Sequence, residues 1–539
     1  MLVAEEKLNA EGALAAGTWG AAASQTVISF PYTGDYRIDA LLQGAEGETG
    51  VGALDYRWNA PSALGATVTV TYSFMTLKPW YGGTDDGDGD TGFGEFTTAQ
   101  KTAVRAIMDR LEAELGINFT EVSDSQSSFG KIRFGNNHQE VSAGYAWLPN
   151  STGDGSDANL SGDVWISDDG PSYVTPVAGN NAWDTLVHEI GHALGLKHPG
   201  NYNAGSGQAP EPGNYLGTAE DNYDYTVMSY EYSPNGHQLR DWYGIYDLLA
   251  LKKLYGAGTY GAGDTVYSYG NSAGANRQVI DDASGFDTLD LSSMTSIGST
   301  VDLRPGGFSS VGQYAGSPAV GNLSIDFTTI IEKFIGTARE DSVIGNDASN
   351  IFVLGAGGND ADGGNGIDTV IYPGGRDGFS ASMWDGTVHV TSAGSVDTLV
   401  NVERVDFTDV NLAFDLAGHA GTVAKLIGAL FGAGAVQVHP EYVGIGLGLI
   451  DGGMSEGTLT QYAINARFGA SHTHGDLVTT LYTNVAGVAP SPELHASFTS
   501  QLDGGTQTEP GLALFAAEHA VNAQNIGLVG LTQTGLAYV

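Results

Sequence analysis

The chain of 539 residues contains no cysteine. Without thiols it can form no disulfide framework, and it offers no sulfur ligand to a metal ion. Basic residues are also scarce, because 21 lysines and arginines stand against 62 aspartates and glutamates, which gives a formal net charge of −41. Such an acidic chain is not expected to bind nucleic acid or an anionic membrane as its main partner.

Long apolar runs are missing as well. The richest stretch, residues 423–450, is interrupted by many glycines and is not expected to span a membrane. Near the N-terminus, Glu5, Glu6 and Lys7 precede any apolar core, which argues against a secretory signal peptide. We therefore expect a soluble protein, and any export would not use an N-terminal signal.

Glycine is in excess. The chain has 79 glycines, about twice the average share, and they concentrate in particular segments. The acidity is consistent with a halophile-like solvated surface, with many calcium ligands, or with both. The clustering of the glycines favours turns and metal-binding loops over a general surface adaptation.

At this length the chain is expected to contain several domains. Residues 1–36 are rich in alanine and glycine, consistent with a propeptide, a disordered arm or a first strand. Residues 37–258 mix both periodicities, which predicts an α+β domain. The expected strands are 67–75, 131–134 and 164–166, and the expected helices are 98–115, 183–196 and 244–254.

Residues 259–416 change to short strands separated by glycine, aspartate and asparagine. A quasi-repeat of about nine residues at the centre is typical of a parallel β-roll. Backbone carbonyls of the glycine turns and carboxylates of stacked turns would give calcium its oxygen ligands. The turns open at Gly336, Gly345, Gly355 and Gly363, and five residues after each of these come Asp341, Asn350, Asp360 and Asp368.

Residues 420–539 are rich in alanine and leucine and predict an all-α domain. Pro440-Glu441 recurs as Pro492-Glu493 at an offset of 52 residues, and the run Asp-Gly-Gly at 451–453 recurs at the same offset. We interpret this as two copies of a helical hairpin unit.

The run from His188 to Pro199 contains the candidate metal ligands. His188 and His192 are four residues apart, so on a helix both imidazoles lie on one face. Glu189 follows the first histidine, and Gly195 can end the helix in a left-handed conformation. The turn would bring back His198 as a third ligand, and three protein ligands with an open position describe a catalytic zinc site.

The pattern His-Glu-x-x-His-x-x-Gly-x-x-His-Pro at 188–199 is the signature of the metzincin peptidases, and Met228 lies about 30 residues further on, as their methionine turn requires. The chain resembles the serralysin branch over roughly residues 37–375. Further matches are Ile38-Asp39-Ala40-Leu41-Leu42, Tyr-Ser-Phe-Met at 72–75, Gly-Tyr-Ala-Trp-Leu-Pro at 144–149, Gly-Asp-Val-Trp at 162–165 and the nonapeptide repeats.

The resemblance implies roles for these residues. His188, His192 and His198 would bind zinc, and Glu189 would be the general base. Tyr230 would ligate zinc at rest and swing aside to stabilise the oxyanion, while Met228 would form the hydrophobic floor beneath the histidines. The edge strand that holds an extended peptide would consist of Gly144, Tyr145, Ala146 and Trp147.

The resemblance also implies a structural calcium site at the domain junction. Gly261 and Ser284 depart from the family pattern there, although either position can contribute a backbone carbonyl. The helical residues 420–539 resemble a domain of unknown function appended to other exported proteins with such repeats. The junction ligands would be Gly261, Gly263, Thr265, Asp282, Ser284, Asp287 and Glu332.

These features predict a secreted zinc endopeptidase that acts on extracellular polypeptides and needs one zinc ion and several calcium ions. We expect export by a type I route, with calcium folding the acidic turns outside the cell. A cell-surface partner of the helical domain is a further expectation. The alternative is a calcium-dependent surface or matrix protein that keeps the peptidase fold as a scaffold.

Overall fold

The computed structural model describes residues 2–4, 31–44, 49–81, 91–139, 142–149, 157–202, 213–469 and 471–539. Packing divides the chain into two compact units, residues 1–287 with 300–330 and residues 288–299 with 331–539. Residues 300–330 thus pack with the first unit, although their sequence texture groups them with the repeats. Most of the predicted N-terminal segment, residues 5–30, lies outside the described residues.

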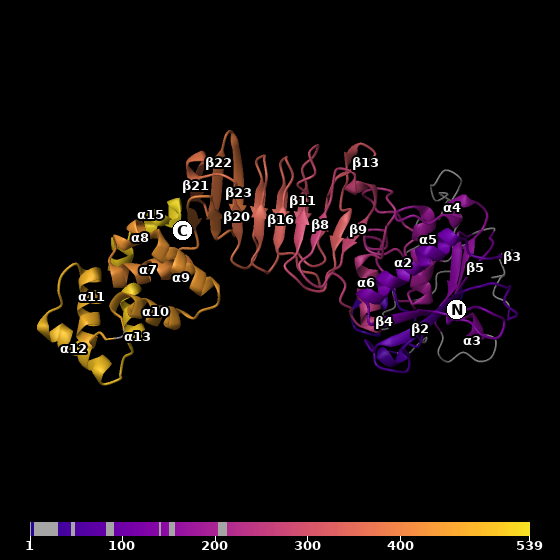
Figure 1. Cartoon of the computed structure of the whole chain (residues 1–539), viewed down its shortest axis with the longest axis horizontal. Helices are drawn as coiled ribbons and strands as arrows, with labels where there is room; N and C mark the ends of the chain where they lie inside the picture. The colour runs from indigo at the N-terminus through magenta and orange to yellow at the C-terminus, as the bar shows by residue number, and fades with distance from the viewer. Residues whose placement is uncertain are drawn as a thin grey trace. The chain divides into compact units, whose positions relative to one another are not determined.

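The first unit is built on a seven-stranded mixed sheet, of which Figure 1 labels β2, β3, β4 and β5. The strand order is β1-β6-β7-β5-β2-β4, with β3 beside β5. The pairs β2–β4, β2–β5 and β5–β7 are parallel, and β1–β6, β6–β7 and β3–β5 are antiparallel. The strands are β1 Leu2–Ala4, β2 Val68–Phe74, β3 Thr91–Gly94, β4 Ile117–Glu121, β5 Ile132–His138, β6 Gly144–Trp147 and β7 Asp163–Ser167.

Two helices of this unit follow the predicted spacing closely. In α2 (Thr98–Glu114), Val104, Ile107 and Leu111 are buried, and a capping box between Thr97 and Gln100 starts the helix. In α5 (Asn181–Ala193), every residue after Trp183 is buried, so the helix lies inside the domain. The other helices are α1 Tyr36–Asp39, α3 Asp157–Leu160, α4 Pro171–Val174 and α6 Ile245–Tyr255, with a 3-10 turn η1 at Val51–Ala53.

After α6 the first unit continues in short strands. Strand β9 pairs in parallel with β15, which pairs antiparallel with β12, and β13 and β14 form a hairpin. These strands are β8 Val266–Ser268, β9 Gln278–Ile280, β11 Thr300–Asp302, β12 Phe308–Ser309, β13 Gln313–Tyr314, β14 Ser317–Pro318 and β15 Leu323–Ile325, with a turn η2 at Ala273–Ala275.

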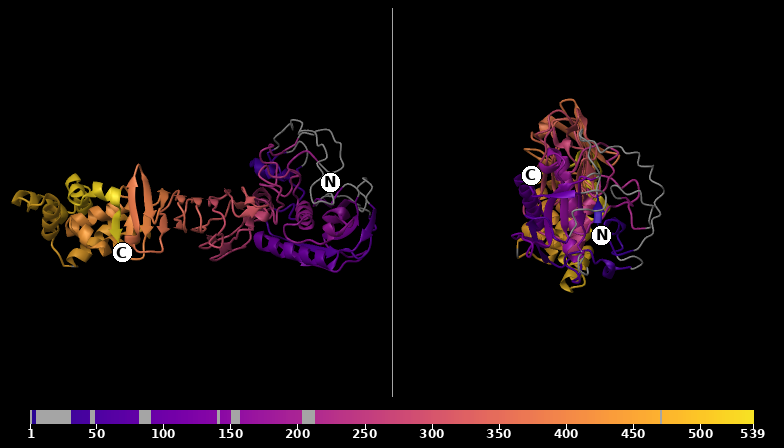
Figure 2. Two further views of the ribbon diagram at one scale, coloured as in Figure 1. Left: turned by 90° about the horizontal axis from the view of Figure 1, so that it is seen from above. Right: turned by 90° about the vertical axis from the view of Figure 1, so that its right-hand side faces the viewer.

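The strands of the second unit form two parallel rows (Figure 2). One row contains β10, β16, β18, β20 and β24, and the other contains β17, β19 and β23. Inward residues Phe334, Val343 and Phe352 are fully buried. The strands are β10 Thr288–Asp290, β16 Lys333–Ile335, β17 Ser342–Ile344, β18 Ile351–Val353, β19 Asp360–Asp362, β20 Thr369–Ile371, β21 Phe379–Trp384, β22 Thr387–Ser392, β23 Ser395–Val400, β24 Arg404–Asp406 and β25 Asn411–Ala413, with a turn η3 at Arg376–Gly378.

Helices follow the strands, and the sequence repeat recurs in them. Helices α9 and α12 both begin at Pro-Glu and end at Asp, and each has 12 residues. The helices are α7 His419–Phe431, α8 Ala435–Val438, α9 Pro440–Asp451, α10 Glu456–Phe468, α11 His474–Ala486, α12 Pro492–Asp503, α13 Glu509–Ala517, α14 Ala520–Asn525 and α15 Leu528–Thr534. Among the helices of the described residues, none combines the length and apolar character needed to cross a membrane.

The predicted all-α character of residues 420–539 is wrong at one place. Residues Leu536–Tyr538 form strand β26, which pairs antiparallel with β25, and the Tyr538 hydroxyl donates to Asp406 Oδ1 at 2.8 Å. Leu536 is buried and belongs to the apolar core of the helices, whereas Ala537 and Tyr538 are half-buried.

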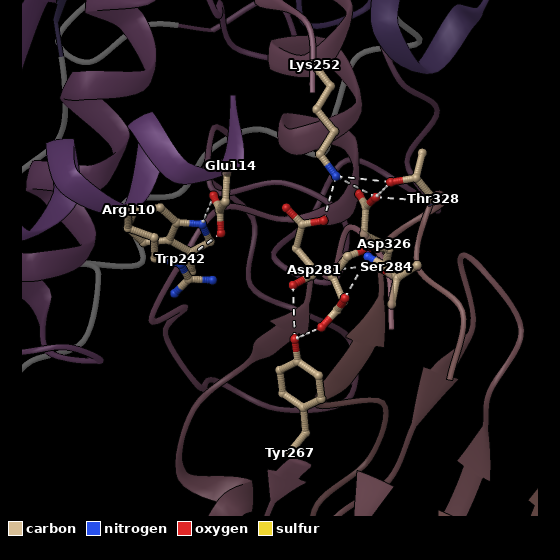
Figure 3. A network of polar contacts seen from close by, with 11 residues as sticks. Arg110, Glu114, Trp242, Lys252, Tyr267, Asp281, Ser284, Asp326 and Thr328 are labelled. Carbon is tan, nitrogen blue, oxygen red and sulfur yellow. Dashed lines mark hydrogen bonds and ion pairs between the residues drawn. The ribbon is translucent and has the colours of Figure 1, made fainter. Parts of the chain in front are cut away.

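A buried glutamate at the end of α2 belongs to a polar network of the first unit (Figure 3). Glu114 Oε1 accepts from Arg110 Nε and Oε2 accepts from Trp242 Nε1, both at 2.8 Å. The Glu114 side chain has no exposed surface. Burial raises the pKa of Glu114 to about 7, although Arg110 acts in the opposite direction.

The raised pKa of Glu114 predicts a pH-dependent stability. The folded chain binds a proton at Glu114 more tightly than the unfolded chain does. The contribution of this proton to the free energy of unfolding is therefore fully present below about pH 4.5 and is lost as the pH rises through about 7. Chemical denaturation should show that Glu114→Gln gains stability over the wild type by up to about 3 kcal/mol between pH 5 and pH 8. The matched control is Glu112→Gln, an exposed neighbour on the same helix; equal pH slopes for wild type and Glu114→Gln would contradict the prediction.

Candidate metal centre

The three histidines of the sequence motif meet at one point. The Nε2 atoms of His188, His192 and His198 lie 3.0, 3.2 and 3.3 Å apart in pairs. Helix α5 provides the first two, one turn apart, and Gly195 has a φ of +108° at the turn that returns the chain to the third. These atoms form a group that could hold a metal ion.

A hydrogen bond at Nδ1, on the far side of each imidazole, orients the ring towards this point. The Nδ1 atoms of His188 and His192 contact the carbonyl oxygens of Val227 and Leu196, both at 2.7 Å, and His198 Nδ1 contacts the Tyr202 carbonyl at 2.9 Å. A carbonyl oxygen only accepts, so each Nδ1 carries the hydrogen and each neutral ring directs its Nε2 lone pair at the common point.

The donor set fits zinc. Ligand nitrogens about 2.0–2.1 Å from a tetrahedral zinc ion are about 3.3 Å apart, close to the spacing found here. Three converging lone pairs repel one another unless a cation lies between them. Three imidazoles are also the ligands of known catalytic zinc sites, in which the fourth position stays open.

The loop that contains Met228 supports the centre from below. A Cβ added to Gly191 on α5 would lie 2.8 Å from Met228 Sδ, so the thioether contacts the backbone of the motif helix. Val227 in this loop supplies the carbonyl for His188, and Asp247 on α6 accepts the Val227 N–H at 2.8 Å. The same carboxylate accepts the Thr226 hydroxyl at 2.5 Å, which makes Asp247 the residue that fixes this loop.

Glu189 lies between the motif helix and strand β6. Its side chain is fully buried, and a Cβ added to Gly144 would be 2.9 Å from both Glu189 Cγ and Oε1. Only a residue without a side chain leaves room for the carboxylate at this position of β6.

Two tyrosines cover the third histidine. The Tyr230 ring centroid is 4.6 Å from that of His198 and 6.4 Å from that of His188. Tyr202 stacks on His198 at 5.5 Å, and its hydroxyl donates to Asp221 Oδ1 at 2.7 Å. Burial raises the pKa of Tyr202 well above its usual range, so this hydroxyl keeps its hydrogen.

The predicted substrate strand is present as β6. Tyr145 stacks on Trp165 at 6.4 Å, and its hydroxyl accepts from Asn137 Nδ2 at 2.9 Å. Its side chain therefore belongs to the interior, whereas Trp147 at the end of β6 is half-buried.

Six of the seven predicted junction ligands lie in two neighbouring loops of the first unit. The N–H of Thr265 donates to Asp287 Oδ1 at 2.8 Å, and the N–H of Gly263 donates to the Ser284 carbonyl at 2.6 Å. The Tyr267 hydroxyl donates to Asp282 Oδ2 at 2.6 Å (Figure 3). The Thr265 hydroxyl lies 3.1 Å from the carbonyls of both Gly261 and Gly263. Glu332 belongs to the second unit, where its carbonyl accepts from Ile351 N.

A buried polar ladder runs through the second unit. Asp341 N donates to Asn359 Oδ1 at 3.0 Å, Asn350 N to Asp368 Oδ1 at 2.7 Å, and Asn359 N to Asp397 Oδ1 at 2.8 Å. Each side chain of the ladder thus holds the backbone of the coil beside it.

One predicted calcium ligand, Asp360, lies outside this ladder. Asp360 is exposed at the start of β19, and Asn359 occupies the ladder position. The spacing is a strict nine residues when it is counted from Asn350 to Asn359 to Asp368. Leu354 occupies the position that glycine holds in the neighbouring turns at Gly345 and Gly363. The prediction counted five residues from Gly355 instead, so the count ended one residue too late, at Asp360.

Several residues around the centre were not predicted from the sequence. Tyr202, Asp221 and Asp247 carry no spacing signal relative to the histidine motif. Strict nine-residue counting would have found Asn359. A further group of potential ligands, His138, Asp168 and Asp169, is exposed, and no sequence motif indicates it.

Comparison with known proteins agrees with this geometry. The sequence profile Reprolysin_5, described as metallo-peptidase family M12, matches residues 84–241. Serralysin of Proteus mirabilis is 37% identical over 325 residues, which cover 55% of this chain and 63% of that protein. The matched region is therefore similar to the serralysins, and residues 84–241 match the metallo-peptidase profile.

Other similar proteins are metallopeptidase AprA of Pseudomonas marginalis and serralysin C of Dickeya chrysanthemi. They are 34% and 30% identical over 311 and 315 residues, which cover 53% of this chain and 61% of each relative. The chain therefore spans about three-fifths of the length of the curated relatives that it matches.

The role of Asp247 beside the metal centre can be measured. Asp247→Asn replaces an acceptor of three hydrogen bonds, including that from Gly244 N at 2.7 Å, with a side chain that also donates. Because the loop orients His188, we expect zinc affinity to fall about 10-fold, measured by competition with a chelator. Asp109→Asn, at an exposed position of α2, is the control. If folded Asp247→Asn bound zinc as tightly as the wild type, Asp247 would not be needed to orient His188.

Proposed function

We propose that this chain is a secreted zinc-dependent endopeptidase that hydrolyses peptide bonds of extracellular proteins. The observation that carries the proposal is the convergence of three oriented imidazole nitrogens beside a buried glutamate and a sheet strand. The names of the similar proteins, serralysin and metallopeptidase, support the same reaction.

Zinc, when bound by His188, His192 and His198, would lower the pKa of water to about 7 and polarise a substrate carbonyl. Glu189 accepts the proton of the attacking water and passes it to the leaving amine nitrogen. Its burial beside Gly144 holds the carboxylate next to the strand on which the peptide would lie.

Tyr230 would stabilise the negative charge that develops on the substrate carbonyl oxygen. Its ring packs at the edge of the histidine cluster, where a hydroxyl can donate a hydrogen bond to the substrate oxyanion. Tyr230 is also proposed as a zinc ligand of the resting enzyme, and Met228 as the hydrophobic floor. Residues 144–147 would bind the peptide through backbone pairing.

Structural calcium is the second part of the proposal. The two junction loops bring the carbonyls of Gly261 and Gly263 together with the carboxylates of Asp282 and Asp287, all oxygen donors of the kind calcium prefers. In the second unit, the parallel rows and the ladder support a β-roll. The candidates for further calcium sites are Gly336, Asp341, Gly345, Asn350, Gly355, Gly363 and Asp368.

The domain division stays a proposal: 1–36 as a propeptide, 37–258 catalytic, 259–416 the β-roll, and 420–539 the helical domain with its two-fold repeat. Export by a type I route and a cell-surface partner of the helices are likewise expectations. No contact among the described residues favours a surface protein with a scaffold role over the peptidase, because a scaffold has no need of three converging imidazoles.

The peptidase proposal predicts the behaviour of Glu189→Ala. Without a proton acceptor, hydrolysis of an unfolded protein substrate should fall by about 100- to 10,000-fold, while bound zinc, measured by elemental analysis, stays at the wild-type level because the three imidazoles remain. Glu441→Ala, at an exposed position of the helices, is the control. Full activity in zinc-loaded Glu189→Ala would refute the mechanism.

The calcium proposal predicts a stabilisation by mass action. Calcium at about 100 times its dissociation constant should raise the free energy of unfolding by about 2.7 kcal/mol per site. Asp287→Asn, at a buried junction position, should reduce this gain, whereas Asp360→Asn, at an exposed one, should not. Thermal unfolding with and without calcium measures both variants. If calcium raised the free energy of unfolding less in Asp360→Asn than in the wild type, Asp360 would be a calcium ligand.

A further inference from the structure

The described N-terminal residues occupy one side of strand β6. Strand β1 pairs antiparallel with β6, with Leu2 opposite Trp147, Val3 opposite Ala146 and Ala4 opposite Tyr145. Strand β7 fills the other side of β6. In the sheet order, β1 is terminal, so it covers the backbone groups that would otherwise form the open edge of the sheet.

This edge leads to the metal centre. Strand β6 packs on the motif helix α5, and its first residue, Gly144, touches the Glu189 side chain. Because the pairing is antiparallel, β1 runs from Trp147 towards the Gly144 end of β6. An extended peptide that approached Glu189 along β6 would have to use the same backbone N–H and C=O groups.

We infer that the N-terminal strand is an internal competitor of the substrate, which occupies the peptide-binding edge of β6 by backbone pairing. This inference rests on the proposed function, since the edge matters only if a peptide binds there. It also gives the sequence a means of latency that needs no thiol, which the chain lacks. Competition follows because each backbone group of the edge can pair with only one strand at a time.

Three paired residues make a weak contact, and tethering is what makes it effective. A strand that belongs to the same chain pairs without the cost of capturing a second molecule, and dilution does not separate it from the edge. If the strand covers the edge about ten times more often than it leaves it free, the apparent affinity for substrate falls about tenfold. The contact is therefore reversible, and a substrate at high concentration displaces it.

Binding measured without hydrolysis tests the inference. The full chain and a chain that lacks residues 1–30, both carrying Glu189→Ala, are titrated into fluorescein-labelled insulin B chain and followed by fluorescence anisotropy. We expect about tenfold tighter binding by the shortened chain. Equal dissociation constants for two folded, zinc-loaded chains would overturn the inference.

A second measurement distinguishes strand pairing from other effects of the truncation. A synthetic peptide of residues 1–8 is added in trans to the shortened chain and should compete with the labelled peptide. N–H groups of alternate residues point to the same neighbouring strand. N-methylation should therefore weaken competition either at Val3 alone or at both Leu2 and Ala4. The same effect at all three positions, or at none, would overturn the inference.

Hydrolysis by the chains with Glu189 intact separates this inference from the peptidase proposal. If the shortened chain bound the peptide more tightly but neither chain hydrolysed it, the peptidase proposal would be refuted, and β1 would still compete for the edge of β6. Hydrolysis with no difference in binding between the long and short chains would refute the strand and leave the peptidase.

Discussion

Hydrogen bonds from three imidazole N–H groups to backbone carbonyls hold the metal centre in shape. They tie His188 to the methionine loop, His192 to the end of its own helix and His198 to the loop at Tyr202. The first bond joins residues 39 apart in the chain and forms only in the folded domain, whereas each of the other two spans four residues. Metal affinity and folding of the first unit are therefore coupled, because the nitrogens converge only when all three carbonyls are in place.

Local patterns predicted the parts of the site that depend on spacing along one element. A four-residue interval placed His188 and His192 on one helix face, and Gly195 adopts the left-handed conformation that the motif requires. Asp247 could not be predicted in this way, because it reaches the centre through tertiary contacts. Asp360 lies beside the ladder for a simpler reason: in a strand, a slip of one residue exchanges the inner and outer faces.

The scarcity of basic residues gives the buried ones structural importance. Arg133 pairs with Asp124, and Lys252 lies between Asp281 and Asp326 at 2.6 and 2.9 Å (Figure 3). Arg404 pairs with Asp415 and Asp451 in the second unit. Removing one partner of such a pair leaves a charge buried without compensation, which typically costs about 3–5 kcal/mol. Most of the acidic excess is then free to stay on the surface, where water and salt screen it.

The ladder of the second unit restricts how this part of the chain can change in length. Its bonded partners are 18 residues apart, as in the pairs Asp341–Asn359 and Asn350–Asp368, because neighbouring nine-residue coils alternate between the two rows. Loss of one coil would move every later strand to the opposite row, whereas loss of two would leave each partner in register. The hairpin of β21 and β22 is inserted between Asn359 and Asp397 without breaking their bond. Length variants of this unit should therefore differ by pairs of coils or by insertions at turns.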